Sequence, residues 1–268
     1  PLTALERRLL RLPPIGLWPP ELFGDDFPRE LTAAVWSMLL RPQPCAEGVL
    51  VAGPEQLVFF GDAAERPLWT RGPSGTTGRQ GKFELPDSNV LVVPGPFQPA
   101  MADGRVFTRW GLDPSRRFLT GVAAFDLRNG EMLWSTADDP GLSDLWPSTD
   151  PAAGDGRVYF LALRKGDLSV LPVSTVWLVC LDGARGSLLW RRPLATQSVA
   201  LMTGPYSNYP YNQFDLAHYG NAVAVDRGAV YCQTTLGFVA RCDARDGVIE
   251  WTYAYPRVQL RWNIQSVV

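Results

Sequence analysis

The chain has few lysines and histidines and almost no net charge. Its 268 residues include 25 Lys and Arg, 27 Asp and Glu and one His, which gives a formal net charge of −2. Only Lys82 and Lys165 are lysines, and the arginines are scattered rather than gathered in a stripe. Binding to nucleic acid requires clustered positive charge that displaces the counterions around phosphates. The sequence therefore predicts that nucleic acid is not a partner.

Cysteine pairs and long hydrophobic runs are also missing. The four cysteines, Cys45, Cys180, Cys232 and Cys242, form no C-x-x-C pair and have no zinc-type spacing, so we expect no metal site. Their disulfide state and the compartment stay open. No stretch reaches the ~20 apolar residues of a membrane-spanning helix. The longest candidate, residues 31–40, is too short, so we expect no transmembrane segment.

What the sequence does contain is typical of a folded, turn-rich chain. Hydrophobic residues make up 46% and charged residues 19%, with 24 prolines, 25 glycines and 10 tryptophans. Residues 1–45 differ from the rest, because Thr3 and Glu6 form a capping box and prolines soon end the helix that it starts. We expect a partly helical lead-in over residues 1–45 that packs as a lid or strap, with a membrane-surface or partner helix as the alternative.

Three stretches of the chain close with the same pattern, Asp-x-x-x-Gly-x-x-x-Trp. The three copies are Asp126, Gly130 and Trp134; Asp182, Gly186 and Trp190; and Asp243, Gly247 and Trp251. Each closure follows a matching opening segment, at residues 103–107, 155–159 and 226–231, and a degenerate first copy ends at Trp69. This internal repeat predicts an all-β chain of about four units, each a run of short strands.

The repeat has a physical logic of its own. Segments such as residues 156–163 and 176–181 are too continuously apolar for a sheet with one wet face, and they suit sheets covered on both faces. The Asp carboxylate can accept backbone N–H groups in a turn, and the Gly can adopt a positive φ. The Trp fits a contact between units, with its ring buried and its indole N–H bonded to an acceptor. The pattern thus predicts a β-propeller with four-stranded antiparallel blades.

These closures resemble the quinoprotein-type propeller repeat, whose blades end in Ala-x-Asp-x-x-x-Gly-x-x-x-Trp, a tryptophan docking motif that links neighbouring blades. The resemblance covers residues 99–251 well and 46–71 weakly, and the motif alanine is present at 124 but replaced by Cys180 and Arg241. Members usually have eight blades, which implies that this chain is part of a larger ring. A closed four-bladed ring is the alternative. We predict blades at residues 46–71, 88–136, 150–193 and 220–255, and a further strand over 257–268.

The resemblance divides the functional hypotheses. One kind of member is a quinone-dependent alcohol or sugar dehydrogenase with PQQ and calcium at the ring axis beside adjacent cysteines. The other is a non-catalytic scaffold, such as the lipoprotein of the outer-membrane assembly machinery, which implies a periplasmic or other extracytoplasmic location. The closest two cysteines here, Cys232 and Cys242, are not adjacent. We therefore expect a non-catalytic module with no cofactor, and a fragment of a PQQ-dependent dehydrogenase is the alternative.

One loop is a candidate binding site. Residues 204–219 combine tyrosines with amides, and such side chains supply rigid contact area and adaptable hydrogen bonds in interfaces. The candidate residues are Tyr206, Asn208, Tyr209, Tyr211, Asn212 and His218. The alternative is an insertion between blades that packs on its own ring. The hypothesis is a loop that contacts a protein or glycan partner, and no catalytic residues are predicted.

Overall fold

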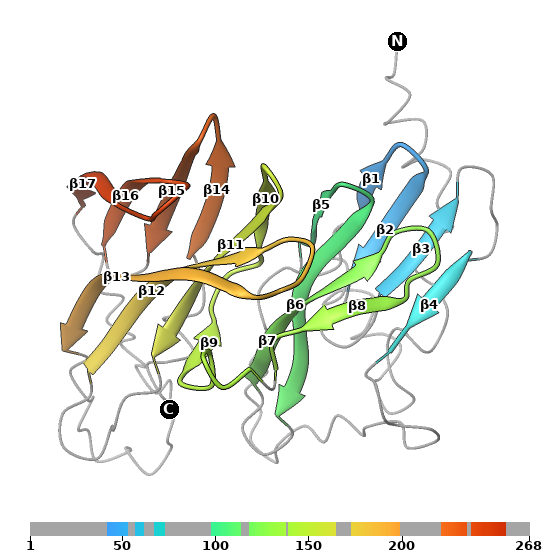
Figure 1. Ribbon diagram of the computed structural model, residues 1–268, viewed down its shortest axis with the longest axis horizontal. Coiled ribbons are helices and arrows are strands. Elements are labelled where there is room, and N and C mark those ends of the chain that lie inside the picture. The colour runs from blue at the N-terminus through green and yellow to red at the C-terminus, as the bar shows by residue number, and fades with distance from the viewer. Residues whose placement is uncertain are drawn as a thin grey trace, which may run out of the picture.

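The computed structural model describes residues 42–52, 57–61, 67–72, 98–113, 118–137, 139–164, 173–198, 221–234 and 237–255. Every regular element in these ranges is a β-strand, and the strands form four antiparallel sheets, which confirms the all-β prediction (Figure 1). The predicted helical lead-in lies outside the described residues except at its end, where Gln43–Cys45 forms strand β1. Within the described residues, no helix has the length and hydropathy needed to cross a membrane.

Each sheet consists of consecutive strands, each hydrogen-bonded to the next. The first sheet contains β1 (Gln43–Cys45), β2 (Gly48–Ala52), β3 (Leu57–Gly61) and β4 (Trp69–Arg71). The second contains β5 (Ala100–Ala102), β6 (Arg105–Asp113), β7 (Phe118–Asp126) and β8 (Met132–Ser135). The third contains β10 (Ala152–Gly154), β11 (Arg157–Arg164), β12 (Val173–Asp182) and β13 (Leu188–Ser198), and β9 (Leu145–Pro147) also pairs with β11. The fourth contains β14 (Ala222–Asp226), β15 (Ala229–Thr234), β16 (Phe238–Asp243) and β17 (Ile249–Ala254).

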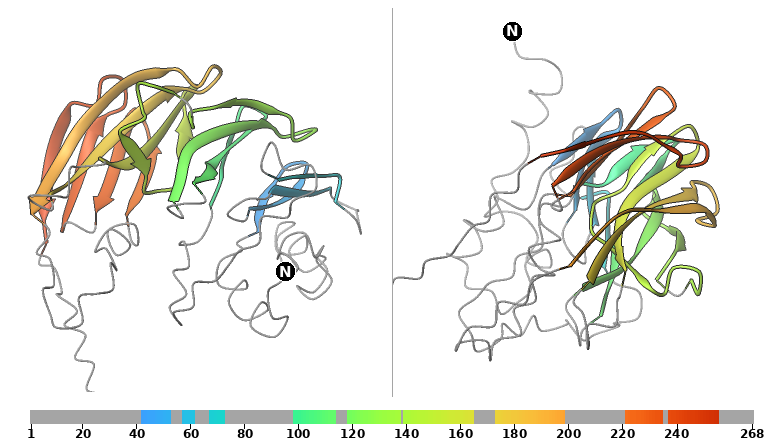
Figure 2. Two further views of the ribbon diagram at one scale, coloured as in Figure 1. Left: turned by 90° about the horizontal axis from the view of Figure 1, so that it is seen from below. Right: turned by 90° about the vertical axis from the view of Figure 1, so that its left-hand side faces the viewer.

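The sheets follow one another along an arc in the order of the chain (Figure 2). Strands β5 and β10 lie in contact, as do β10 and β14, so the first strands of the second, third and fourth sheets are adjacent. Between sheets the side chains form continuous apolar clusters, one between the first and second sheets, one between the second and third and one between the third and fourth. This is the side-by-side packing of propeller blades, in which each sheet is buried by its neighbours.

Burial on both faces follows directly from the sequence pattern. All five residues of β2 are buried, and so are the six central residues of β11. In β11 the alternate residues Tyr159, Leu161 and Leu163 pack toward the fourth sheet, whereas Val158 and Phe160 pack toward the second. Because successive side chains point to opposite faces of a strand, a continuous apolar run is what a doubly covered sheet requires.

The two short turns of each blade lie at the same edge of the sheet. The opening segments form two-residue hairpins with positive φ at both positions, for example Asp103 (52°) and Gly104 (71°). The closing turn is bonded to the opening one, since Leu127 N donates to Gly104 O (3.0 Å), Gly183 N to Gly156 O (2.8 Å) and Ala244 N to Gly228 O (2.9 Å). One edge of the arc therefore carries both turns of the second, third and fourth blades.

Candidate functional site

The Asp-x-x-x-Gly segments form the same closed turn in all three copies. The Asp carboxylate accepts a backbone N–H two residues on, from Arg128 (2.7 Å), Ala184 (2.9 Å) and Arg245 (2.7 Å). The Gly N–H donates back to the Asp carbonyl at 2.8, 2.8 and 2.9 Å, and the Gly φ is 69°, 72° and 73°. At the third copy the Arg245 guanidinium hydrogen-bonded to Asp243 lowers the pKa of that carboxyl. The aspartates are thus engaged within their own turns.

Each of these glycines lies against a tryptophan of the preceding blade. A Cβ on Gly130 would lie 2.5 Å from the ring of Trp69, one on Gly186 2.5 Å from Trp134, and one on Gly247 2.6 Å from Trp190. No side chain fits at such distances without a shift of the ring or the turn. The spacing of the motif therefore brings together the Trp of one blade and the Gly of the next, and not residues of a single copy.

The closing tryptophans occupy equivalent places in successive sheets. Trp134 pairs with Ala124, Trp190 with Cys180 and Trp251 with Arg241, and in each sheet a β-bulge follows directly. Trp69 and Trp134 donate their indole N–H to the carbonyl one residue after the next blade's Asp, Leu127 O at 3.0 Å and Gly183 O at 3.2 Å. Replacement of the motif alanine by Cys180 does not prevent the contact between Trp134 and Gly186.

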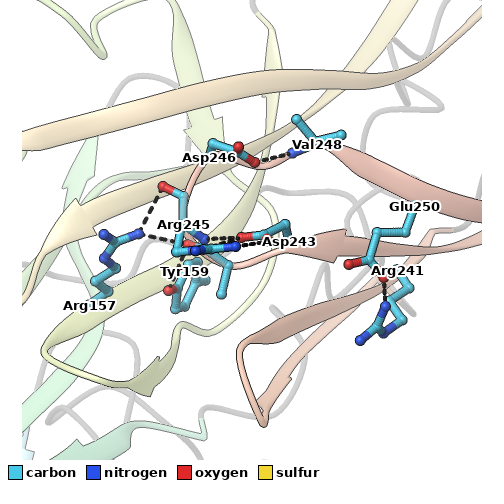
Figure 3. A network of polar contacts seen from close by, with 9 residues as sticks. Arg157, Tyr159, Arg241, Asp243, Arg245, Asp246, Val248 and Glu250 are labelled. Carbon is cyan, nitrogen blue, oxygen red and sulfur yellow. Dashed lines mark hydrogen bonds and ion pairs between the residues drawn. The ribbon is translucent and has the colours of Figure 1, made fainter.

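The junction between the third and fourth blades uses different donors. There the corresponding carbonyl, Ala244 O, accepts from the Tyr159 hydroxyl at 3.0 Å and from Arg157 at 2.9 Å, as Figure 3 shows. Arg157 also donates to Arg245 O at 2.9 Å. The Trp190 indole N–H is buried without a hydrogen-bond partner, so the expectation of an acceptor is wrong at this blade. The physical reason is that Tyr159, where the second blade has Phe107, supplies a hydroxyl that binds the shared acceptor.

Two further arginines contribute to the junctions and, like Arg157, were not singled out from the sequence. Arg71 donates to Gly130 O at 2.7 Å and to Asn129 O at 3.2 Å, and Arg192 donates to Asp246 O at 3.0 Å. Both arginines lie two residues after a closing Trp, where alternation of side chains along the strand places them beside it. The recurring Trp-x-Arg spacing was the available signal, although the second blade has Thr136 at this position.

A second group of polar contacts lies just before β5, β10 and β14, the first strands of their sheets. Asp150, just before β10, accepts from Arg109 Nε of β6 at 2.8 Å and from Gln98 N, just before β5, at 2.7 Å. Asn221, just before β14, donates to Ser148 Oγ at 3.2 Å. These contacts join the second, third and fourth blades. The ion pair is largely buried, with side-chain exposures of 9% for Arg109 and 14% for Asp150.

The predicted binding residues of the tyrosine loop, Tyr206, Asn208, Tyr209, Tyr211, Asn212 and His218, lie outside the described residues. So does the predicted strand over 257–268. The described residues on either side of the loop end at Ser198 and resume at Asn221. The binding role of this loop therefore stays a prediction.

The buried cysteines are shielded thiols. Burial raises the pKa of Cys180 to about 12, and the hydrogen bond between Cys232 and Cys242 together with burial raises the pKa of Cys232. Cys232 pairs with Ala240, so Cys242 is its diagonal neighbour across the strands. Diagonal Cα atoms lie ~7–8 Å apart, which is too far for an unstrained disulfide. The fold thus places these two thiols in contact, and they form no disulfide in the structure.

A quinone and calcium site would need clustered metal ligands. Among the described residues, no three side chains of His, Cys, Asp or Glu gather where they could hold a metal ion. Calcium requires about six to eight oxygen ligands, which a protein supplies from clustered carboxylates and carbonyls. The aspartates that the repeat provides accept backbone N–H groups in their turns instead.

Four antiparallel blades that pack in chain order and interlock through Trp and Gly define the class, a β-propeller protein. The family model described as "Outer membrane protein assembly factor BamB" matches residues 33–200 and again 121–267. The chain belongs to this family of PQQ-type repeat proteins, as its closing motifs indicated.

Solved structures are similar to this chain at low sequence identity. BamB from Moraxella catarrhalis is 15% identical over 80% of this chain and 48% of its own, with a TM-score of 0.44. A europium-containing methanol dehydrogenase is 16% identical over 80% of this chain and 42% of its own, with a TM-score of 0.50. The quinohemoprotein alcohol dehydrogenase ADHIIG from Pseudomonas putida HK5 is 15% identical over 80% of this chain and 33% of its own, with a TM-score of 0.49. The chain thus spans less than half of the length of each, and no curated protein matches it by sequence.

Proposed function

We propose that this chain is a non-catalytic propeller scaffold that binds a protein partner and serves the assembly of outer membrane proteins. The family to which it belongs supports this proposal. The observation that carries it is the use of the repeat's polar residues. The motif aspartates accept turn N–H groups, and the tryptophans, Arg71, Arg157 and Tyr159 bind the next blade. Groups committed to blade packing build a rigid platform rather than a reactive centre.

The partner is expected at the loops rather than at the turn edge. The turn edge carries only two-residue hairpins and short closing turns, whereas longer connections join the blades. The tyrosine loop is the strongest candidate among these connections, because Tyr and Asn side chains favour protein interfaces. A glycan is the alternative ligand of the same loop. A periplasmic or other extracytoplasmic location accompanies the proposal, by family likeness.

The test combines a loss of the chain with a variant of the loop. Cells without the chain should contain less folded outer-membrane β-barrel protein, measured as the heat-modifiable fraction on gels. Re-expression of the chain should restore this fraction, and the variant Tyr209→Ala with Tyr211→Ala should restore less of it. The thermal unfolding of the variant should stay close to that of the parent. Unchanged barrel levels on loss of the chain would refute the assembly role, and a large stability loss in the variant would favour a packing role for the loop.

The alternative, a piece of a PQQ-dependent dehydrogenase, has a direct test. The purified chain is mixed with PQQ and calcium, and bound cofactor absorbance and dye-linked oxidation of alcohols or sugars are measured. The scaffold proposal expects neither signal. Stoichiometric cofactor binding with turnover would replace the scaffold by the dehydrogenase.

A further inference from the structure

Two thiols lie in contact in the core between the third and fourth blades. Cys232 of β15 and Cys242 of β16 are both fully buried in this core cluster, and they are hydrogen-bonded to each other. The turn edge is close by, because Cys242 directly precedes Asp243, the first residue of the closing turn. Two neighbouring thiols are the groups that disulfide exchange can join covalently. The pair is therefore a candidate modification site beside the closing turn of the fourth blade.

The register of the strands opposes a disulfide between these cysteines. Cys232 pairs directly with Ala240, and Cys242 pairs with Val230, so the two cysteines are diagonal neighbours. Diagonal Cα atoms lie ~7–8 Å apart, whereas a disulfide needs about 4.4–6.8 Å. To bring Cys242 opposite Cys232, β16 must slide along β15 by two residues, about 7 Å. A slide of two residues keeps every side chain on its own face of the sheet, so the slipped hairpin still turns its apolar side to the third blade.

The same slide moves the closing turn, which makes the polar contacts of the junction. In the native register Ala244 N donates to Gly228 O of the opening turn at 2.9 Å. Ala244 O accepts from the Tyr159 hydroxyl at 3.0 Å and from Arg157 at 2.9 Å, which Figure 3 shows. Gly247 packs on the closing Trp of the third blade. A turn displaced by about 7 Å loses all of these contacts.

The side of the fourth blade that faces away from the third blade is open. Tyr231 is 37% exposed, Trp251 is 45% exposed and Tyr253 is 66% exposed. Within the described residues, β17 pairs with β16 and no further strand lies beyond it. In this part of the chain, the strand register and the junction with the third blade are therefore what fix the position of the closing turn.

From this geometry we infer that Cys232 and Cys242 are a redox modification site whose disulfide holds the fourth blade out of its native register. The reduced pair is compatible with the native register and with the junction. The oxidised pair fixes the slipped register and separates Ala244 from the side chains of the third blade. The inference does not depend on the proposed function.

The reaction is thiol–disulfide exchange with a disulfide oxidant, R–S–S–R. The thiolate of one cysteine attacks a sulfur of the oxidant, so that the S–S bond breaks, one RS⁻ leaves and a mixed disulfide forms. The second thiolate attacks the cysteine sulfur of the mixed disulfide, which forms the bond between Cys232 and Cys242 and releases the second RS⁻. The two thiol protons pass to the released thiolates, so the cysteines lose two electrons and the oxidant becomes two RSH. Because both thiols are fully buried, the oxidant reaches them only while the blade is undocked.

The first test compares oxidation of the native and the unfolded chain. Full chain with Cys45→Ser and Cys180→Ala keeps only the two thiols of the site, and Ala is the residue that the second blade has at the position of Cys180. Oxidised glutathione is the oxidant, and free thiols are counted after an acid quench. The pair should oxidise on the order of a hundredfold or more slowly in the native chain than in urea. Equal rates would overturn the inference, because docking would then not control the site.

Amide hydrogen exchange measures the register after the urea is removed. In the native register Ala244 N–H donates to Gly228 O of the other turn, whereas Gly247 N–H donates to Asp243 O within the closing turn. The disulfide should speed exchange at Ala244 by on the order of tenfold or more and leave exchange at Gly247 nearly unchanged. Reduction should restore the protection of Ala244. An oxidised chain in which Ala244 stays protected would overturn the inference, and so would a loss that persists after reduction.

A disulfide in the native register is the matched control. Cys242→Ala with Ala240→Cys places the second thiol directly opposite Cys232, where Cα atoms lie ~4.5–5.5 Å apart and a disulfide fits. Oxidation of this variant should leave Ala244 as protected as in the reduced chain. Loss of protection here as well would show that any crosslink in the hairpin disturbs the blade, and it would refute the role assigned to the register.

Discussion

The contact between Gly186 and Trp134 supports a prediction with a built-in control. Gly186 and Gly156 lie in the same blade with nearly equal φ values, 72° and 70°. A Cβ on Gly186 would lie 2.5 Å from Trp134 Cδ2, whereas a Cβ on Gly156 would meet nothing within 4 Å. The two glycines therefore differ in the space around them and hardly in their backbone conformation.

The expected free energies follow from these two terms. An Ala with a left-handed φ costs about 1–2 kcal/mol, and this term is common to Gly156→Ala and Gly186→Ala. Forcing a methyl group into the Trp134 ring adds about 1–3 kcal/mol through displacement of the ring or the turn. Gly186→Ala should thus lower the free energy of unfolding by about 1–3 kcal/mol more than Gly156→Ala does.

Urea unfolding followed by far-UV circular dichroism measures both variants, and a double-mutant cycle isolates the ring. In a Trp134→Ala background the ring is gone, so Gly186→Ala should cost no more than Gly156→Ala, a coupling of about 1–3 kcal/mol. Equal losses for the two glycine variants in the parent chain would refute the reasoning. A cost of Gly186→Ala that persists without the Trp134 ring would also refute it.

Three further predictions concern buried groups. Asp150→Asn leaves the Arg109 charge largely buried beside an amide and should lower the free energy of unfolding by about 3 kcal/mol. Asp144→Asn is the control and should cost at most about 1 kcal/mol, because its ion pair with Arg191 is roughly one-third exposed. Equal effects in urea unfolding would show that burial of the pair does not matter. In the folded chain at pH 8, a thiol reagent should modify Cys45 and leave the other three cysteines protected until denaturant is added, because they are fully buried. Since burial raises the pKa of Cys180 from 9.0 to about 12, the free energy of unfolding should keep its full value below pH 9 and fall as the pH rises from 9 toward 12. Rapid modification of several thiols in the native chain would contradict the burial on which the labelling pattern and this pH dependence both rest.

The strands and turns could be read from the sequence because they depend on neighbouring residues. The continuous apolar run of β11 predicted a strand covered on both faces, and the structure buries it on both. The Asp-x-x-x-Gly spacing predicted a turn with a left-handed glycine, and Gly130, Gly186 and Gly247 have such φ values. Hydrogen bonds that span two to four residues are set by the chain itself, so their pattern survives in the order of the residues.

The sequence predicted the contacts between blades less completely than the strands and turns within them. The pattern suggested that each closing Trp would find an acceptor, but at the third blade Tyr159 and Arg157 bind that acceptor instead of Trp190. The pairing of Arg109 with Asp150 joins residues 41 positions apart and has no signature in spacing. The candidate site in the tyrosine loop rests on composition alone, and it stays a prediction.

The sequence by itself determined the all-β class, the number and order of the repeats and the residues that form each closing turn. The tertiary structure decided which Trp meets which Gly, which donor binds each shared carbonyl and which face of the fourth blade is left open. The physical reason is range: turn chemistry and strand alternation act within about ten residues, whereas competition for one acceptor or the covering of one face depends on groups that only packing brings together.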